Sequence, residues 1–117
     1  MSFSCLLVDD SEEFLASASR LLDSQGVEIV GSVTTGGEAV HLARAFAPDV
    51  ALVDIQLGDE DGIALSRELD AHAPSTRVVL ISSYDRDDLA DLISDSPAVG
   101  FLPKNVLGVA AISKLID

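Results

Sequence analysis

The chain contains 117 residues, of which 48 % are hydrophobic, so it can bury one sizeable core and predicts a single domain over residues 1–117. Its 20 acidic residues outnumber 7 basic ones, and the net charge of −13 argues against direct binding to nucleic acid or to an anionic membrane. No apolar run is long enough to span a membrane, the N-terminus lacks the basic region of a signal peptide, and the single cysteine, Cys5, suits a reducing compartment. We therefore expect a domain that resides in the cytoplasm.

Apolar runs alternate with amphipathic segments from the start of the chain. Residues 3–8 predict a strand that ends at Asp9 and Asp10. Residues 11–24 have helical spacing, and Gly26 is suited to ending that helix because glycine tolerates a left-handed backbone. The expected apolar stripe of this helix comprises Phe14, Leu15, Ala18, Leu21 and Leu22. The less continuous run 27–33 suits an edge strand.

A second helix and the most apolar strand follow. Thr35 and Glu38 have the spacing of a capping box, and the helix that they begin ends before Pro48. The run 50–53 is continuously apolar, which predicts a strand buried on both faces with Asp54 directly after it. The expected apolar face of the second helix comprises Ala39, Val40, Ala43 and Phe46, and residues 57–62 have the composition of a loop.

The second half of the chain continues this alternation. Residues 63–72 predict a third helix that ends before Pro74, and residues 77–81 predict a buried strand that ends at Ser82. We further expect a short acidic helix over residues 85–93, a strand over 99–102 and a last helix over 106–116.

Five β–α units in succession predict an α/β fold with a parallel sheet and helices on both faces. Right-handed crossovers favour the doubly wound strand order 2-1-3-4-5, which places the three most continuously apolar runs at the centre. In such sheets, ligands bind beyond the carboxyl ends of the strands, at the switch point between the first and third. We therefore expect Asp9, Asp10 and Asp54 to lie close together.

Two further polar side chains should join these three carboxylates, because Ser82 follows the fourth strand and Lys104 follows the fifth. Crowded carboxylates repel one another, and one lysine cannot neutralise three of them. Oxygen ligands alone favour a hard cation, of which Mg²⁺ is the best candidate. A metal, an ammonium and a hydroxyl side by side are suited to a phosphoryl group, and a carboxylate can act as a nucleophile toward phosphorus.

Four motifs carry a family resemblance: Leu7-Val8-Asp9-Asp10, Val53-Asp54, Ile81-Ser82-Ser83 and Gly100-Phe101-Leu102-Pro103-Lys104. In this order and spacing they resemble the receiver domain of bacterial two-component response regulators, over essentially the whole chain. The resemblance implies a flavodoxin-like fold that a sensor histidine kinase phosphorylates on an aspartate, with Mg²⁺ as cofactor. It also implies a domain that catalyses its own phosphorylation and dephosphorylation but is not a multiple-turnover enzyme.

The resemblance assigns roles at the centre of the expected site. Asp54 corresponds to the phosphoacceptor and contributes to the metal site. Asp10 corresponds to the direct Mg²⁺ ligand, and Asp9 to an acid that acts on the metal mostly through water. The backbone carbonyl of Gln56 corresponds to another metal ligand, and its side chain to a position that influences hydrolysis of the aspartyl phosphate.

The remaining matches belong to the implied switch. Ser82 corresponds to the hydroxyl that turns toward the phosphoryl group, Lys104 to the lysine that pairs with it, and Phe101 to the aromatic switch position. Gly58 stands where many receivers have proline, which predicts a looser loop. Asn105 stands after the lysine where many receivers have another proline, so a cis peptide is not assumed there.

Several of these positions have plainer alternative roles. Asp9 and Asp10 could simply cap the following helix, since Asp10 and Glu13 also have capping-box spacing. Ser82 alone would be a turn hydroxyl, and Lys104 alone a solvated cation. The acids of the predicted helix at residues 85–93 form either a solvated face or a docking surface.

The implied function is a signalling switch in which a phosphoryl group on Asp54 alters a distant face. One rival interpretation is a small aspartate-nucleophile phosphatase, which would need an acid where Gln56 stands. Another is a stand-alone receiver that acts by protein–protein contact. The motif at residues 100–104 is similar to that of receivers fused to helix-turn-helix domains, so a transcriptional regulator is the favoured output, with a C-terminal DNA-binding domain or a homodimer as partner.

Overall fold

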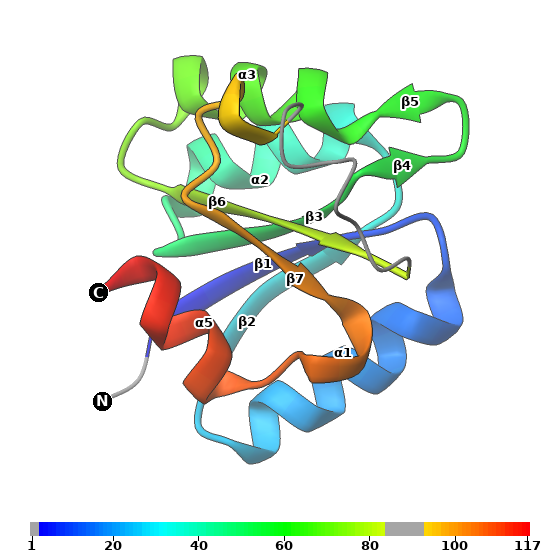
Figure 1. Cartoon of the computed structure of the whole chain (residues 1–117), viewed down its shortest axis with the longest axis vertical. Helices are drawn as coiled ribbons and strands as arrows, with labels where there is room; N and C mark the ends of the chain where they lie inside the picture. The colour runs from blue at the N-terminus through cyan, green and yellow to red at the C-terminus, as the bar shows by residue number, and fades with distance from the viewer. Residues whose placement is uncertain (1–2, 84–92) are drawn as a thin grey trace.

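The computed structural model describes residues 3–83 and 93–117, in which helices pack on both sides of a central sheet (Figure 1). The strands of this sheet are β1 (Ser4–Val8), β2 (Glu28–Val33), β3 (Val50–Asp54), β6 (Arg77–Ser82) and β7 (Gly100–Pro103). The helices are α1 (Glu12–Ser24), α2 (Gly36–Phe46), α3 (Gly62–His72) and α5 (Val109–Ile116), with a 3₁₀ helix at Lys104–Val106. The acidic helix predicted over residues 85–93 lies outside the described residues except at its last position.

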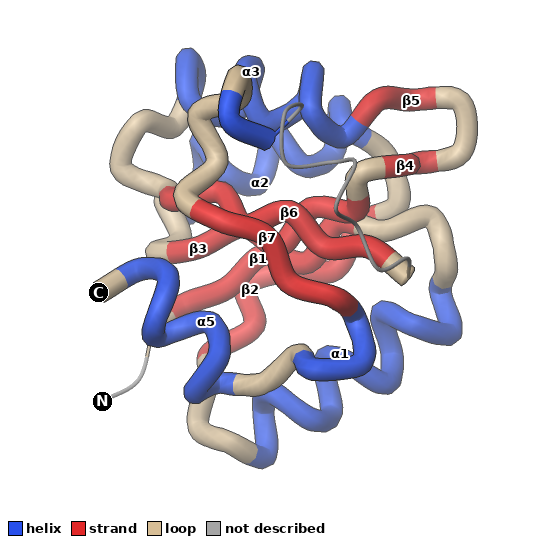
Figure 2. The backbone as a smooth tube through the Cα atoms, viewed as in Figure 1, coloured by secondary structure: helices blue, strands red, loops and turns tan. Residues whose placement is uncertain are grey.

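The order of the strands confirms the predicted fold. Within the described residues, five strands form a parallel sheet in the order β2-β1-β3-β6-β7, which is 2-1-3-4-5 when the strands of this sheet are counted along the chain. The predicted edge strand, β2, does lie at an edge. Helices α1 and α5 cover one face, and α2 and α3 cover the other, as the flavodoxin-like architecture requires (Figures 1 and 2).

Successive side chains of each central strand enter two different cores. Leu6 and Val8 of β1 pack beneath α2 and α3, whereas Cys5 and Leu7 pack against α1 and α5. This alternation explains why the central runs are apolar at every position, because neither face is left to water. Burial also raises the pKa of the Cys5 thiol to about 12, so the thiol stays protonated and has a structural role.

The ends of the helices follow the predictions only in part. Gly26 follows α1 with a φ of 91°, as expected of a glycine that ends a helix. Helix α2 ends at Phe46, before Pro48 as predicted, and its C-cap, Ala47, adopts a left-handed φ of 44°. Leu21 and Phe46 are 41 % and 59 % exposed, and their assignment to buried faces was wrong. Leu21 flanks the buried stripe, and Phe46 is the last residue of its helix.

Two segments near the carboxyl edge of the sheet differ from the predictions. Residues 57–62 were expected to form a loop, but β4 (Gln56–Leu57) and β5 (Glu60–Asp61) pair as an antiparallel hairpin. Gly58 has a φ of 60°, which the first residue of a tight type II′ turn requires, so glycine here closes the hairpin instead of loosening it. The last helix begins at Val109, three residues later than expected, because the 3₁₀ helix precedes it. No helix in the described part of the chain is long and apolar enough to cross a membrane.

Candidate functional site

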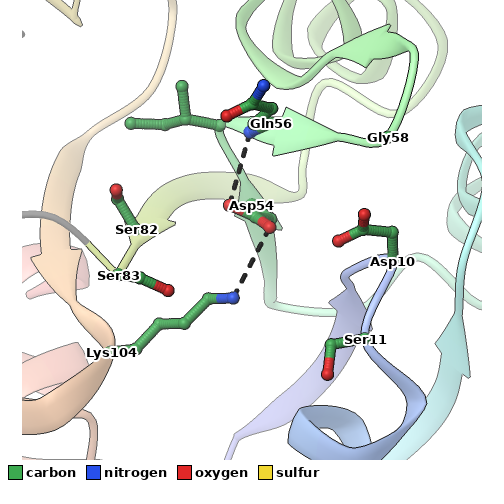
Figure 3. A pocket seen from close by; sticks show the side chains of 9 residues that line it. Asp10, Ser11, Asp54, Gln56, Gly58, Ser82, Ser83 and Lys104 are labelled. Atoms are coloured by element: carbon green, nitrogen blue, oxygen red, sulfur yellow. Dashed lines mark hydrogen bonds and ion pairs between the residues drawn. The ribbon is translucent and has the colours of Figure 1, made fainter.

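A cavity of about 340 Å³ opens at the carboxyl edge of the sheet, where β1, β3, β6 and β7 end (Figure 3). Its lining comprises Asp10, Ser11, Asp54, Ile55, Gln56, Gly58, Ser82, Ser83 and Lys104. Five of the residues predicted to form the site are therefore found around one cavity. Asp9 and Phe101, the other two predicted residues, are not part of the lining.

Three carboxylates meet at the predicted switch point between β1 and β3. One oxygen atom from each of Asp9, Asp10 and Asp54 lies within 4.8 Å of the others. Asp9 is fully buried and Asp54 is 8 % exposed, whereas Asp10 is open to solvent. The cluster therefore presents one accessible acid in front of two shielded ones.

Asp9 is held on both sides although it lies outside the cavity lining. Its backbone N–H donates to the Val33 carbonyl at 3.1 Å, and its Oδ1 accepts from the Ser11 N–H at 2.9 Å. Its Oδ2 lies 2.6 Å from the Lys104 Nζ, yet this buried oxygen accepts no hydrogen bond of good geometry within the described residues. The Asp9 Oδ2 therefore forms an ion pair with Lys104 but has no well-aligned hydrogen-bond donor among the described residues.

Asp54 occupies the centre of the site, between a backbone donor and a cation (Figure 3). Its Oδ1 accepts from the Gln56 N–H at 3.3 Å, and its Oδ2 lies 3.5 Å from the Lys104 Nζ. Burial raises the pKa of the Asp54 carboxyl above its usual value, and the neighbouring charge of Asp9 raises it further. Lys104 and the Gln56 N–H oppose this rise without cancelling it.

Lys104 reaches the carboxylates from the beginning of the 3₁₀ helix that follows β7. Its ammonium contacts both Asp9 and Asp54 and also lies 4.4 Å from the centroid of the Phe14 ring. The ring face of an aromatic side chain attracts a cation. Sequence reasoning assigned Phe14 only to the apolar stripe of α1 and missed this contact, for which the helical spacing gave no signal.

Ser82 and Phe101 have different relations to the cavity. Ser82 is the last residue of β6, is 4 % exposed and lines the cavity, as predicted. Phe101 lies in β7, is half-buried and packs against the core beneath α2 and α3. The structure therefore does not bring the Phe101 ring into the cavity with Asp54.

The turn into helix α1 corrects one alternative role for Asp10. Ser11 is the N-cap of α1, because its Oγ accepts from the Phe14 N–H at 3.2 Å. The capping-box reading of Asp10 and Glu13 is therefore wrong by one residue. A cap at Ser11 leaves the Asp10 carboxylate directed toward the cavity (Figure 3).

Gly62 fixes the other side of the site. Its N–H donates to the Ile55 carbonyl at 2.7 Å, and a Cβ at this position would collide with the Asp54 carbonyl oxygen. A residue with any side chain would therefore displace the backbone that carries Asp54. Gly62 is also the first residue of α3, whose N-cap is Asp61.

The donor set suits a hard divalent cation. Asp9, Asp10 and Asp54 supply only oxygen ligands, and one ammonium leaves two of their three negative charges unbalanced when all are ionised. The Asp9 Oδ2 is buried and, within the described residues, has only an ion pair with Lys104, without an aligned hydrogen-bond donor, so it retains lone pairs that a further cation or its water could use. Mg²⁺ prefers such ligands and retains several waters, which the open side of the cavity can accommodate.

Comparison with known proteins places this chain in one family. The family model for the response regulator receiver domain matches residues 5–116. Over 113 residues the chain is 34 % identical to a protein-glutamate methylesterase/protein-glutamine glutaminase of Vibrio parahaemolyticus, with 94 % of this chain and 30 % of the relative covered. It is 29 % identical over 100 residues to the response regulator GacA of Pseudomonas aeruginosa, with 85 % of this chain and 47 % of GacA covered.

A solved structure agrees with these relatives. The signal receiver domain of the response regulator NarL from Mycobacterium tuberculosis superposes with a TM-score of 0.87 at 29 % identity, and the match covers 98 % of this chain and 96 % of that one. The chain spans less than half of the length of the two curated relatives above. The chain belongs to the response regulator receiver domains of two-component systems.

Proposed function

We propose that this chain is a phosphorylation-dependent switch in which Asp54 accepts a phosphoryl group from a phosphohistidine of a sensor histidine kinase, with Mg²⁺ as cofactor. The observation that carries the proposal is the position of Asp54, whose carboxylate faces an open cavity between an ammonium and two further carboxylates. We also propose that residues 1–117 form one such domain, and that it acts in the cytoplasm together with its kinase.

In the proposed reaction, one carboxylate oxygen of Asp54 attacks the phosphorus atom and forms a new P–O bond. The P–N bond of the phosphohistidine breaks, and its electron pair and a proton remain with the imidazole. Lys104 lies on the Oδ2 side of Asp54, where its ammonium can pair with a phosphoryl oxygen. Ser82 lines the same cavity, so its hydroxyl can donate to another phosphoryl oxygen.

Asp9, Asp10, Asp54 and the backbone carbonyl of Gln56 would hold the Mg²⁺. When bound, the ion offsets the negative charge of the transferring phosphoryl group. The phosphoryl charge then favours a state in which Lys104 and Ser82 contact it, and these differential contacts shift the population of two conformations. Phe101, which packs against the core beside β7, is the proposed aromatic reporter of that shift.

The proposal is tested by incubation with acetyl phosphate and Mg²⁺, followed by mass spectrometry of the intact protein. We expect a gain of one phosphoryl group that requires Mg²⁺ and is absent in Asp54→Asn. Asp59→Asn is a matched control, because Asp59 is an exposed acid at the hairpin turn outside the cavity lining. An unchanged gain in Asp54→Asn would show that another residue is the acceptor.

A turnover assay separates the proposed switch from a small phosphatase. An aspartate-nucleophile phosphatase requires an acid near the nucleophile, but the residue two positions after Asp54 is Gln56, whose side chain carries no acidic proton. We expect no steady turnover of a phosphate monoester such as p-nitrophenyl phosphate. Many turnovers per protein molecule would contradict the proposal.

We propose that this domain is part of a longer protein and that the switch controls an effector domain of that protein. The motif at residues 100–104 favours a C-terminal helix-turn-helix domain and transcriptional regulation, with a homodimer as the active form. GacA is described as a response regulator, whereas the Vibrio relative is a methylesterase and glutaminase. Reading the coding frame beyond Asp117 tests this assignment, since a helix-turn-helix sequence there supports it and an esterase sequence overturns it.

A further inference from the structure

One side chain ties the β4–β5 hairpin to helix α2. The Glu60 Oε1 accepts a hydrogen bond from the Gly36 backbone N–H at 3.0 Å, across 24 residues of sequence. Gly36 is the first residue of α2, where the N–H groups lack partners inside the helix. The partial positive charge of a helix N-terminus also favours a carboxylate. The contact is therefore a charge-assisted link between two elements that the main sheet does not connect.

The glycine at position 36 is what makes room for this link. A Cβ built on Gly36 would lie 2.7 Å from the Glu60 Oε1, closer than Cβ atoms approach other atoms in folded proteins, and 3.3 Å from the Leu65 Cδ1. The neighbouring Gly37 differs, because a Cβ there would meet nothing within 4 Å. Of the two glycines, only Gly36 lies where an added side chain would collide with Glu60.

The hairpin that Glu60 anchors forms one wall of the candidate site. Gln56 pairs with Asp61, and Leu57 with Glu60, across the two strands. The Gln56 N–H donates to the Asp54 carboxylate, and Gly58 at the turn lines the cavity. Any displacement of the outer strand therefore moves the backbone on which Gln56 lies.

The remaining attachments of the hairpin are at its base and on its inner strand. The Gly62 N–H donates to the Ile55 carbonyl at 2.7 Å, and the Leu57 side chain is 2 % exposed in the core. The link from Glu60 is made from β5, the outer strand, next to the turn. Leu57, which pairs with Glu60, holds the inner strand in the core, so the contact of Glu60 adds the restraint on the outer strand.

We propose that Glu60 is a positioning residue for the metal site. By holding the hairpin against α2, it keeps the Gln56 carbonyl where it can bind Mg²⁺, without being a ligand itself. This inference rests on the proposed function, in which Gln56 supplies a backbone ligand. The expected consequence of losing the link is weaker Mg²⁺ binding by about two- to five-fold, the range for one carboxylate at a helix N-terminus.

The first test compares Glu60→Ala with Glu60→Gln. Mg²⁺ affinity is measured by titration of the Gln56 amide signal in NMR spectra, and the acetyl phosphate reaction is followed as a function of Mg²⁺ concentration. In Glu60→Ala we expect the half-saturating Mg²⁺ concentration to rise about two- to five-fold while the rate at saturating Mg²⁺ is unchanged. Glu60→Gln retains an oxygen acceptor for the Gly36 N–H but loses the charge, so its Mg²⁺ affinity should lie between those of the wild type and Glu60→Ala.

The second test breaks the same contact from the other side. Gly36→Ala should displace the Glu60 carboxylate and weaken Mg²⁺ binding as Glu60→Ala does. Gly37→Ala is the matched control, because it makes the same Gly-to-Ala change in the first turn of α2 without touching Glu60. The double variant Glu60→Ala/Gly36→Ala should be no weaker than either single variant, since both remove one contact.

Three results would overturn the positioning role. These are an unchanged Mg²⁺ affinity in Glu60→Ala, equal losses in Glu60→Gln and Glu60→Ala, and equal effects of Gly36→Ala and Gly37→Ala. The second would assign the effect to the charge of Glu60 and not to its hydrogen bond. Failure of the proposed function looks different, because then the wild-type protein itself would show no Mg²⁺-dependent phosphorylation of Asp54.

Discussion

Asp54 lies between one cation and one anion, and the surrounding protein excludes most of the water that would otherwise stabilise its charge. Burial and Asp9 both raise the pKa of its carboxyl, while Lys104 lowers it by a smaller amount. The net rise shows that the resting site disfavours the ionised carboxylate that the proposed reaction uses. A bound divalent cation would reverse this balance, because it favours the charged form.

The raised pKa sets a pH dependence for stability. A carboxyl whose pKa is higher in the folded protein contributes stability that is complete below its unfolded value, here 3.8, and is lost as the pH rises through the folded value. Asp54→Asn removes the unfavourable charge, so in EDTA at pH 7 it should stabilise the fold. This gain should shrink as the pH falls toward 3.8.

Thermal melts of Asp54→Asn and wild type across this pH range measure the effect. The exposed Asp59→Asn variant is the control and should change the free energy of unfolding by less than about 0.5 kcal/mol. A destabilised Asp54→Asn variant at pH 7, or a gain that does not change with pH, would contradict the assignment of the raised pKa to the folded site.

Lys104 balances the two buried acids, and its removal should have opposite effects on folding and on metal binding. Lys104→Met keeps an apolar side chain near Phe14 but leaves the Asp9 carboxylate buried without its cation. We expect the free energy of unfolding in EDTA to fall by about 2 kcal/mol. This value lies between those for exposed and for buried ion pairs, because the Lys104 side chain is 16 % exposed. Mg²⁺ should bind several-fold more tightly, since no ammonium competes for the carboxylates.

Urea unfolding in EDTA and a Mg²⁺ titration check the two effects of Lys104→Met. Lys114→Met is a matched control, because it removes the same charge from an exposed position on α5. Weaker Mg²⁺ binding in Lys104→Met, with Lys114→Met unchanged, would show that the ammonium supports the metal site and does not compete with it.

At the scale of elements, the turn from β1 into α1 contains one residue that caps the helix and another that lines the candidate site. Ser11 caps the helix through the Phe14 N–H, and its own N–H holds the Asp9 carboxylate. Asp10 lies between them and presents its carboxylate to the cavity. Neighbouring residues of similar capping propensity thus perform different tasks, which the spacing of the sequence did not distinguish.

Two substitutions in this turn should therefore behave differently. Ser11→Ala removes the acceptor of the Phe14 N–H and should cost about 1 kcal/mol of stability, as for other helix caps. Asp10→Ala should leave the free energy of unfolding in EDTA nearly unchanged but strongly reduce the stabilisation by Mg²⁺. Thermal melts with and without Mg²⁺ measure both, and a cap-sized loss in Asp10→Ala would restore its reading as the helix cap.

The helices illustrate where local pattern was sufficient and where it was not. The stripe of α1 was predicted from spacing, and Leu15, Ala18 and Leu22 are indeed buried. Leu21 and Phe46 are apolar at helical positions yet exposed. Their exposure depends on how each helix sits on the sheet, because a periodic pattern gives the direction of a face but not its width.

The whole molecule is organised by a sheet whose two faces are both covered. Alternate residues of β1 enter different cores, and the acids of the site lie at the carboxyl ends of β1 and β3. The parallel order places the ends of β1 and β3 side by side and directs both into one crevice. The site is thus a consequence of topology, since its residues come from segments far apart in the sequence.

The sequence by itself determined the fold class, the strand order and the residues around the cavity. Continuous apolar runs can be satisfied only inside a sheet covered on both faces, and polar residues directly after such runs must gather at its carboxyl edge. Asp10, Asp54, Ser82 and Lys104 were all found in this way. Each was marked by an abrupt change from apolar to polar residues, which is a local signal.

Only the tertiary structure decided which groups contact one another. The Phe14 ring beside Lys104, the cap at Ser11 and the link from Glu60 to Gly36 depend on the relative placement of elements. The β4–β5 hairpin was likewise hidden, because two-residue strands carry too few residues to show a period. Such contacts are set by distances of a few ångströms between distant segments, and no pattern along a single segment records them.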